Sequence, residues 1–176
     1  MVNVDKLCAE IGFSIPKDKD PSDPTKRFDL TKQENVIRKA LGILSQEGIF
    51  AYLIYLESEG KNITWDENRN TQKSIGDEEK INRLIMFYSA KILNKLGKLH
   101  FPNNLFESEN DKLKLLLKGK SNRDNPDPIW TELKTTLRTE LTKSGSILEN
   151  ISQMFFIKQI LEQMLTYALY RARSLK

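Results

Sequence analysis

Apolar residues recur every three or four positions through most of this 176-residue chain, and this spacing limits the possible folds more than any other feature. Such spacing puts the apolar side chains on one face of an α-helix. No stretch shows a convincing strand alternation, and no internal repeat is present. At this length one domain is expected. We therefore predict an all-α fold, a single-domain helical bundle of about five to seven helices with an N-terminal arm.

The clearest helical pattern covers residues 32–60. Thr31 and Glu34 have the spacing of a capping box, which predicts a helix from about 32 to 46. A glycine inside a helix costs about 1 kcal/mol, so Gly48 predicts a break or kink. Residues 49–60 are apolar on nearly every side and end in Gly60, which suits a C-cap. We expect this second helix to be the buried centre of the bundle.

Four further segments complete the predicted bundle. Residues 61–76 are polar and are expected to form a loop, after which Asp77 caps a helix that ends at Gly97. A short helix opens at Ser108 and runs to about 117, followed by a polar break over 119–128. Pro128 starts the next helix, with Asp127 as its N-cap and Trp130 in the core. The last helix is predicted from Ile147 to about 173.

The N-terminal thirty residues differ in composition from the rest. We expect residues 1–30 to form an arm with a proline-containing linker, and residues 31–176 to form the bundle. Residues 1–15 have an apolar pattern sufficient for one or two helical turns that dock on the body, whereas 16–29 combine three prolines with dense charge and predict an extended linker. Cys8 is expected to be a small buried hydrophobe. A lone cysteine, with no visible secretory signal and no apolar run of about 18 residues, favours a cytoplasmic protein without a membrane span.

The chain offers little for catalysis. It contains one histidine and one cysteine, so the usual zinc sites cannot be assembled, and we predict no metal and no cofactor. His100 is expected in a loop, and Lys95 stands where the arginine-x4-6-histidine motif of HEPN ribonucleases would need arginine. The stretch beginning at Gly119 lacks the upstream glycine of a phosphate-binding loop. We expect a protein that is not an enzyme.

Basic residues are the better candidates for function. The net charge is +4 and the isoelectric point is near 9, which permits a polyanionic partner without requiring one. The candidate phosphate-binding residues are Arg38, Lys39, Lys158, Arg171 and Arg173. A further basic group comprises Lys112, Lys114, Lys118, Lys120 and Arg123, and Trp65 and Trp130 could stack on bases. For any single lysine, the alternative is a solvated surface charge.

Residues 39–59, with Gly48 between two apolar helices, resemble the small subunit of type III CRISPR effector complexes, particularly the III-B form. Residues 154–173 look like the closing helix of that family, with aromatic residues and a loose basic pair at Arg171 and Arg173. The resemblance covers about a quarter of the chain. It implies a non-catalytic subunit in the interior of a ribonucleoprotein with guide RNA, target RNA, other effector subunits and copies of itself. Such a subunit would contact the RNA backbone while base pairing supplies sequence specificity.

Two other functions remain open from the sequence. A helical protein–protein interaction adaptor would use its basic residues only for solubility and would not retain RNA. A helical nucleic-acid enzyme would cleave its substrate in a metal-dependent reaction, which the missing motifs disfavour.

Overall fold

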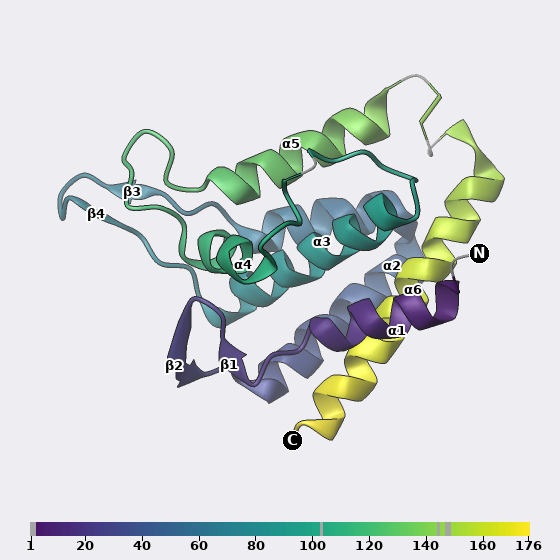
Figure 1. Cartoon of the computed structure of the whole chain (residues 1–176), viewed down its shortest axis with the longest axis horizontal. Helices are drawn as coiled ribbons and strands as arrows, with labels where there is room; N and C mark the ends of the chain where they lie inside the picture. Colours follow the sequence, from purple (N-terminus) through teal and green to yellow (C-terminus); the bar gives the residue numbers. More distant parts are fainter. Residues whose placement is uncertain (1–2, 103, 144, 147–148) are drawn as a thin grey trace.

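The computed structural model describes residues 3–102, 104–143, 145–146 and 149–176 and is an all-α helical bundle, as the apolar spacing predicts (Figure 1). Within these residues the helices are α1 (Val4–Ser14), α2 (Leu30–Gly60), α3 (Asp77–Lys95), α4 (Glu109–Lys118), α5 (Pro128–Thr142) and α6 (Ile151–Ser174). The strands are β1 (Lys19–Asp20), β2 (Asp23–Arg27), β3 (Trp65–Asp66) and β4 (Thr71–Gln72). Four helices lie close to their predicted ranges; the predicted start of the last one, Ile147, lies outside the described residues.

The centre of the bundle is α3, and the prediction that residues 49–60 would be the buried centre is wrong. All residues from 81 to 90 are buried, because α1, α2, α4 and α5 all pack on α3. Polar side chains within this stretch, Arg83 among them, hide its buried character from a hydropathy pattern. By contrast, residues 49–60 leave Phe50 and Ile54 more than half exposed, because no helix covers that face.

The chain folds back on itself inside α2, at the glycine predicted to break it. Gly48 has φ 88° and ψ −176°, outside the helical region and easily reached only by glycine. The ammonium group of Lys39 lies 5.1 Å from the ring centre of Tyr55. Sixteen residues along a straight helix would separate these positions by about 24 Å. The element is therefore a helical hairpin, whose first arm (30–47) packs along α6 and whose second arm (49–60) leads to β3 (Figure 1).

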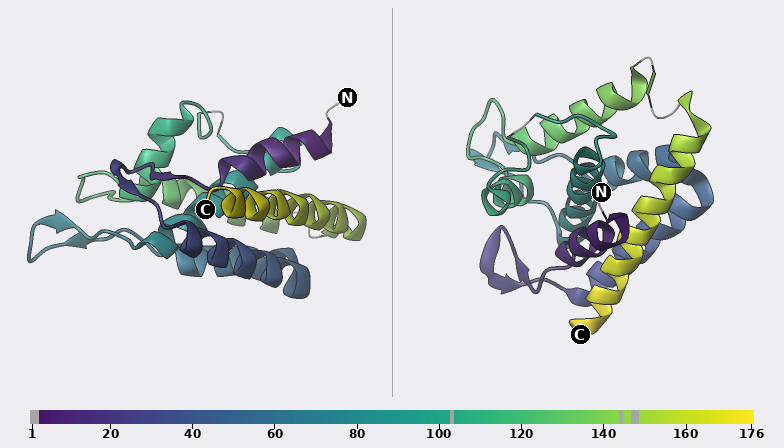
Figure 2. Two further views of the ribbon diagram at one scale, coloured as in Figure 1. Left: turned by 90° about the horizontal axis from the view of Figure 1, so that it is seen from below. Right: turned by 45° about the vertical axis from the view of Figure 1, so that its right-hand side comes forward.

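The N-terminal segment packs on the bundle. Helix α1 has three turns, one more than predicted, and lies across α6 (Figure 2). Cys8 is fully buried, as predicted, and burial raises the pKa of its thiol to about 11. Gly12 does not interrupt the helix; a Cβ there would lie 2.4 Å from the carbonyl oxygen of Met164, so glycine allows the close crossing. Residues 4–28 thus contribute to the same core as the rest of the described chain.

Two short antiparallel ribbons were not expected from the sequence. In the segment predicted to be an extended linker, β1 pairs with β2 around a turn in which the Asp20 carboxylate accepts hydrogen bonds from the backbone and hydroxyl of Ser22. Asp20 is buried and forms an ion pair of 2.6 Å with Lys80 of α3. This ion pair and buried Phe28 fix a segment whose charge and prolines suggest disorder. The second ribbon, β3 with β4, projects from the helices (Figure 2).

Several helix ends use residues other than those predicted. Asp29 caps α2 by accepting from the backbone N–H groups of Thr31 and Lys32, so the expected capping box of Thr31 and Glu34 is wrong. Gly76 is the N-cap of α3, and Asp77 is its first helical residue. The left-handed residue after α2 is Lys61, with φ 44°, and not Gly60. Gly60 is instead required because a Cβ there would lie 2.5 Å from the Trp130 ring.

The ends of three helices converge on one buried guanidinium. Arg83 donates to the carbonyl oxygens of Gly60, Lys61 and Leu116 and to both oxygens of Asp127, so all five of its N–H groups have acceptors. Its guanidinium lies 4.7 Å from the centre of the buried Trp130 ring. Asp127 precedes α5, as predicted, but its side chain makes no capping bond because Arg83 and the Ile63 N–H occupy it.

None of the described helices is both long enough and apolar enough to cross a lipid bilayer.

Candidate nucleic-acid interface

The structure brings part of the predicted basic set together where α2 and α6 pack side by side. Glu34, near the start of α2, is the meeting point: its carboxylate pairs with Arg38 of α2, with Arg173 at the end of α6 and with Lys176 just after α6. The Arg173 Nε lies 3.1 Å from Glu34 Oε1. We call these four residues the Glu34 cluster. It combines three positive charges with one negative charge.

Electrostatics in the Glu34 cluster favour the ionised carboxylate. Hydrogen bonds from Lys176 and then Arg173 lower the pKa of Glu34 to about 2, from an ordinary value of 4.5. The carboxyl group is largely covered, with 9% of the side chain exposed, whereas Arg38, Arg173 and Lys176 are 55%, 49% and 38% exposed. The cations are thus held in place from below by Glu34 while their outer faces remain open to solvent.

Lys158 marks the other end of the same seam between α2 and α6. Its ammonium group donates to the carbonyl oxygen of Ser45, at 2.7 Å, and lies 3.8 Å from Glu162. Lys158 and Arg173 are fifteen residues apart on α6, which corresponds to about 22 Å along the helix axis. Glu34, Arg38 and Ser45 lie on one stripe of α2, so the cations that contact them lie along one side of the α2–α6 seam.

Two of the five predicted residues lie apart from the seam. Lys39 faces the second arm of the α2 hairpin, where it packs on the Tyr55 ring. Arg171 is exposed, but it is two residues from Arg173 and so points about 200° away around α6. In the part of the chain that the structure describes, no carboxylate lies within 4 Å of the Arg171 side chain. The loose basic pair therefore divides between two faces.

Sequence reasoning missed Glu34 as a member of the site, because local spacing assigns it to helix capping. The sequence also offers Lys176, with the other basic residues of the last helix, as a residue that could bind phosphate, but it is not among the five candidates. A carboxylate four residues before Arg38 was the available signal for the first contact, since such pairs face each other on a helix. The contacts to Arg173 and Lys176 depend on how α2 and α6 pack, which local spacing does not specify.

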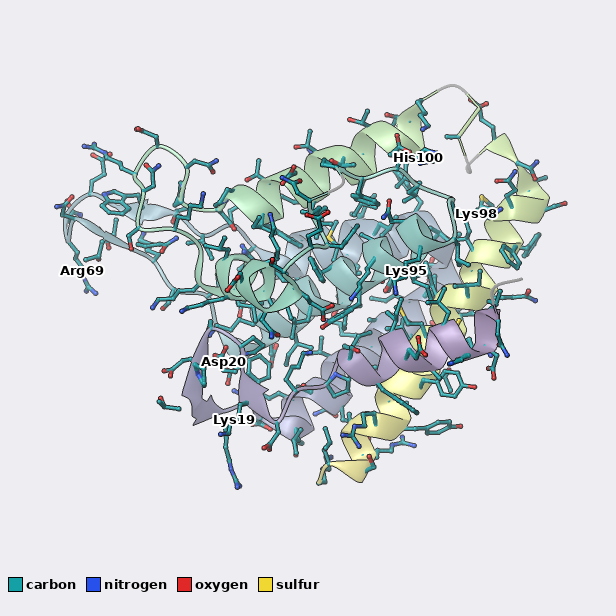
Figure 3. All side chains as sticks on the ribbon, in the orientation of Figure 1. Lys19, Asp20, Arg69, Lys95, Lys98 and His100 are labelled. Carbon is teal, nitrogen blue, oxygen red and sulfur yellow. The ribbon has the colours of Figure 1, made fainter. Side chains whose placement is uncertain are left out.

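The second basic group lies elsewhere. Lys114 and Lys118 are exposed on α4 and line a hollow shared with Ser22 and Lys80, while Arg123 pairs with Glu67 beside the β3–β4 ribbon. Of the two tryptophans, Trp130 is core, as the sequence favours, and Trp65 is half-buried on β3. Figure 3 shows Arg69 at the tip of that ribbon.

His100 lies in the loop after α3, as predicted. It is exposed, and its backbone N–H donates to Glu140. Figure 3 shows it beyond Lys95, at the end of α3. Among the described residues, no three His, Cys, Asp or Glu side chains gather into a group that could hold a metal ion.

A scan of protein-family models and searches of the curated proteins and of the solved structures found no match to this chain.

Proposed function

We propose that this chain is a non-catalytic small subunit of a type III CRISPR RNA-guided interference complex, in which the α2–α6 seam contacts the backbone of the target RNA. Its partners in the cytoplasm would be guide RNA, target RNA, other effector subunits and further copies of itself. The observation that carries the proposal is the set of cations at the two ends of the seam: the partly exposed Arg38, Arg173 and Lys176 at one end, and Lys158, which is 27% exposed, at the other.

The donor geometry suits phosphate oxygens. Arg173 uses its Nε on Glu34, and Arg38 uses one terminal nitrogen, so further N–H groups of both guanidinium groups remain available. A phosphodiester needs such charged donors and no reactive side chain. Because contacts to the backbone carry no sequence information, this surface would hold an RNA strand whose sequence is read by base pairing.

The two segments that resemble the family overlap the helices that form this surface and include Lys158 and Arg173, although Glu34, Arg38 and Lys176 lie just outside them. Residues 39–59 contain most of the α2 hairpin, and residues 154–173 make up most of α6. The resemblance and the charged seam thus come from the same pair of packed elements, which is why we prefer this function to the alternatives.

A salt titration with two triple variants tests the proposal. Arg38→Gln, Lys158→Gln and Arg173→Gln together should weaken binding of single-stranded RNA, measured by fluorescence anisotropy. The slope of log affinity against log salt should fall by about 0.7 for each phosphate that the variant no longer neutralises. The matched control, Lys114→Gln, Lys118→Gln and Lys120→Gln, removes the same charge from α4 and its following loop and should leave the slope unchanged. Equal effects of both triples would reject the seam as the interface.

The adaptor alternative is supported by one separate observation, an apolar groove beside the second arm of α2. An adaptor without nucleic-acid binding predicts that the wild-type chain does not retain RNA even at low salt. Affinity purification from the native host, followed by identification of the bound RNA and protein, separates the two functions: co-purifying guide RNA supports the effector subunit, and protein partners without RNA support the adaptor.

A further inference from the structure

A groove of about 620 Å³ runs between the second arm of the α2 hairpin and α5. Each helix contributes one stripe of residues at helical spacing. The arm supplies Phe50, Leu53 and Ile54, with Lys61 just after it, and α5 supplies Leu137 and Leu141. Met86 of the central helix α3 contributes to the lining between them. The lining is apolar towards Phe50 and Leu141, and its charged residues gather where the end of the arm meets the middle of α5.

This groove is unusual because large apolar side chains in it face solvent. Phe50 is 57% exposed and Ile54 is 52% exposed, although both lie on a segment that is apolar on nearly every side. A helix that is apolar all round is normally covered on all sides. Here α3 covers one side and the groove leaves the other open, so the second arm has an unpartnered face. Contiguous exposed apolar surface of this kind marks binding sites.

The rim of the groove is positively charged. Lys61, Lys134 and Arg138 line the groove with one acidic residue, Glu57, and Lys61 is also paired with Glu79 of α3 at 2.5 Å, so Lys134 and Arg138 are the main cations of this rim. Arg138 is paired with Glu57 across the mouth, but this pair is exposed on the arginine side and contributes little to stability. Lys134 is bound only to the Asn62 side-chain oxygen, at 2.7 Å, and to the face of Trp130, so in the described chain it has no carboxylate partner within 4 Å.

We propose that this groove binds an amphipathic α-helix of a partner protein, with large apolar side chains at positions i, i+4 and i+7 and acidic residues on its flanks. The stripe from Phe50 to Lys61 covers twelve residues, or about 16 Å along the arm, which matches about three turns of a bound helix. The apolar lining would receive the large side chains, and the basic rim would pair with the acidic flanks. The proposal concerns a surface apart from the α2–α6 seam and does not rest on RNA binding.

A second copy of this chain is a poorer occupant. Its best exposed apolar ridge is the start of α6, where Ile151 and Phe155 lie one turn apart. Lys98 packs over the neighbouring Phe156 ring at 5.5 Å. This cation would meet the basic rim of the groove, so the ridge is not complementary to it in charge.

Two designed helical peptides test the proposal with the full-length protein. They share the same apolar positions and differ only in flanks of glutamate or of lysine. We expect the glutamate-flanked peptide to bind about tenfold more tightly or better by fluorescence anisotropy, with the difference shrinking as salt rises. Ile54→Glu should abolish this binding, while Phe155→Glu, an equally exposed apolar position outside the groove, should leave it unchanged. Lys134→Glu with Arg138→Glu should reverse the preference between the two peptides.

Three results would overturn the proposal: no binding of either peptide, equal binding of both, or concentration-dependent self-association of the wild type that Ile54→Glu abolishes. The last result, measured by sedimentation, would assign the groove to a second copy. Because the peptides contain no phosphate, failure here leaves the RNA titration unaffected, and failure of the RNA titration leaves this test intact.

Discussion

Two sites in this molecule join arginine to a carboxylate, and they differ mainly in burial. Arg83 and Asp127 are 0% and 6% exposed, lie at the junction of α2, α4 and α5, and satisfy all five guanidinium N–H groups internally. In the Glu34 cluster the carboxylate is covered, but Arg38 and Arg173 are about half exposed. Arg83 therefore has no donor left for a ligand. Arg38 and Arg173 still have N–H groups that a ligand could use.

The comparison shows that the same pair of residue types can serve the fold or a partner, according to which half is buried. A fully enclosed pair loses hydration on both sides, so neither half can be removed without leaving a charge in the core. A cluster whose cations reach solvent has little to lose when one is neutralised. Stability should therefore depend strongly on Asp127 and weakly on the Glu34 cluster.

The largest effect should come from Asp127→Ala. It leaves Arg83 charged, buried and without its two carboxylate acceptors, which should lower the free energy of unfolding by about 3–5 kcal/mol. Urea denaturation followed by circular dichroism measures the change. Arg123→Ala removes one half of the exposed pair with Glu67 and serves as the control, with an expected change of about 0–1 kcal/mol. Comparable losses in the two variants would contradict the distinction drawn from burial.

The next effect tests the packing around the buried pair. The carbonyl oxygen of Gly60 accepts from Arg83, and an added Cβ would lie 2.5 Å from the Trp130 ring on which Arg83 stacks. Gly60→Ala should therefore destabilise the protein by about 1–3 kcal/mol through overpacking. Gly42→Ala is the matched control, because nothing lies within 4 Å of its added methyl group and alanine should stabilise that helical position by about 0.5–1 kcal/mol. A Gly60→Ala protein as stable as the wild type would show that the Trp130 ring moves freely.

Local rules predicted most helices because each helix is specified by its own apolar stripe. They failed where tertiary contacts determine the outcome. Residues 49–60 looked central because they are apolar all round, while α3 looked amphipathic because Arg83 is among its residues. Only the positions of Gly60, Lys61, Leu116 and Asp127 around that side chain explain how a charged residue occupies the core.

The candidate site was predictable only in part, for the same reason. Arg38 and Arg173 could be chosen as exposed cations on helices, and the i,i+4 spacing indicates the contact of Arg38 with Glu34, but nothing local indicates that Glu34 also holds Arg173, 139 residues later. The prediction of an extended linker in place of the β1–β2 ribbon failed for the same reason, because the buried contact of Asp20 with Lys80 joins residues that are 60 apart in the sequence. Composition and periodicity do not indicate ion pairs between residues that are far apart in the sequence.

A smaller effect is expected when the cations of the exposed site are removed. Arg38→Gln with Arg173→Gln leaves Glu34 with Lys176 and should change the free energy of unfolding by about 1 kcal/mol or less, because both arginines are about half exposed. The same variant should still lose RNA affinity if the seam is the interface. Chemical denaturation and RNA anisotropy on one preparation measure both quantities. A stability loss as large as that of Asp127→Ala would mean that the cluster is part of the core.

The smallest effect is a pH dependence specific to Glu34. The pKa of this carboxyl is about 2 in the folded protein, below its ordinary value of 4.5, so folding favours the ionised form. Its contribution is complete above pH 4.5 and disappears as the pH falls through 2, where the carboxyl is protonated whether the chain is folded or not.

Glu34→Gln resembles the protonated group at every pH. The wild type should therefore be slightly more stable than Glu34→Gln at neutral pH, and the two unfolding curves should converge between pH 5 and 2. Subtracting the variant cancels the titration of all other carboxylates. A difference in stability that stays constant to pH 2 would mean that Lys176 and Arg173 do not hold this carboxylate. Glu34 would then not position the cations that we propose to bind RNA.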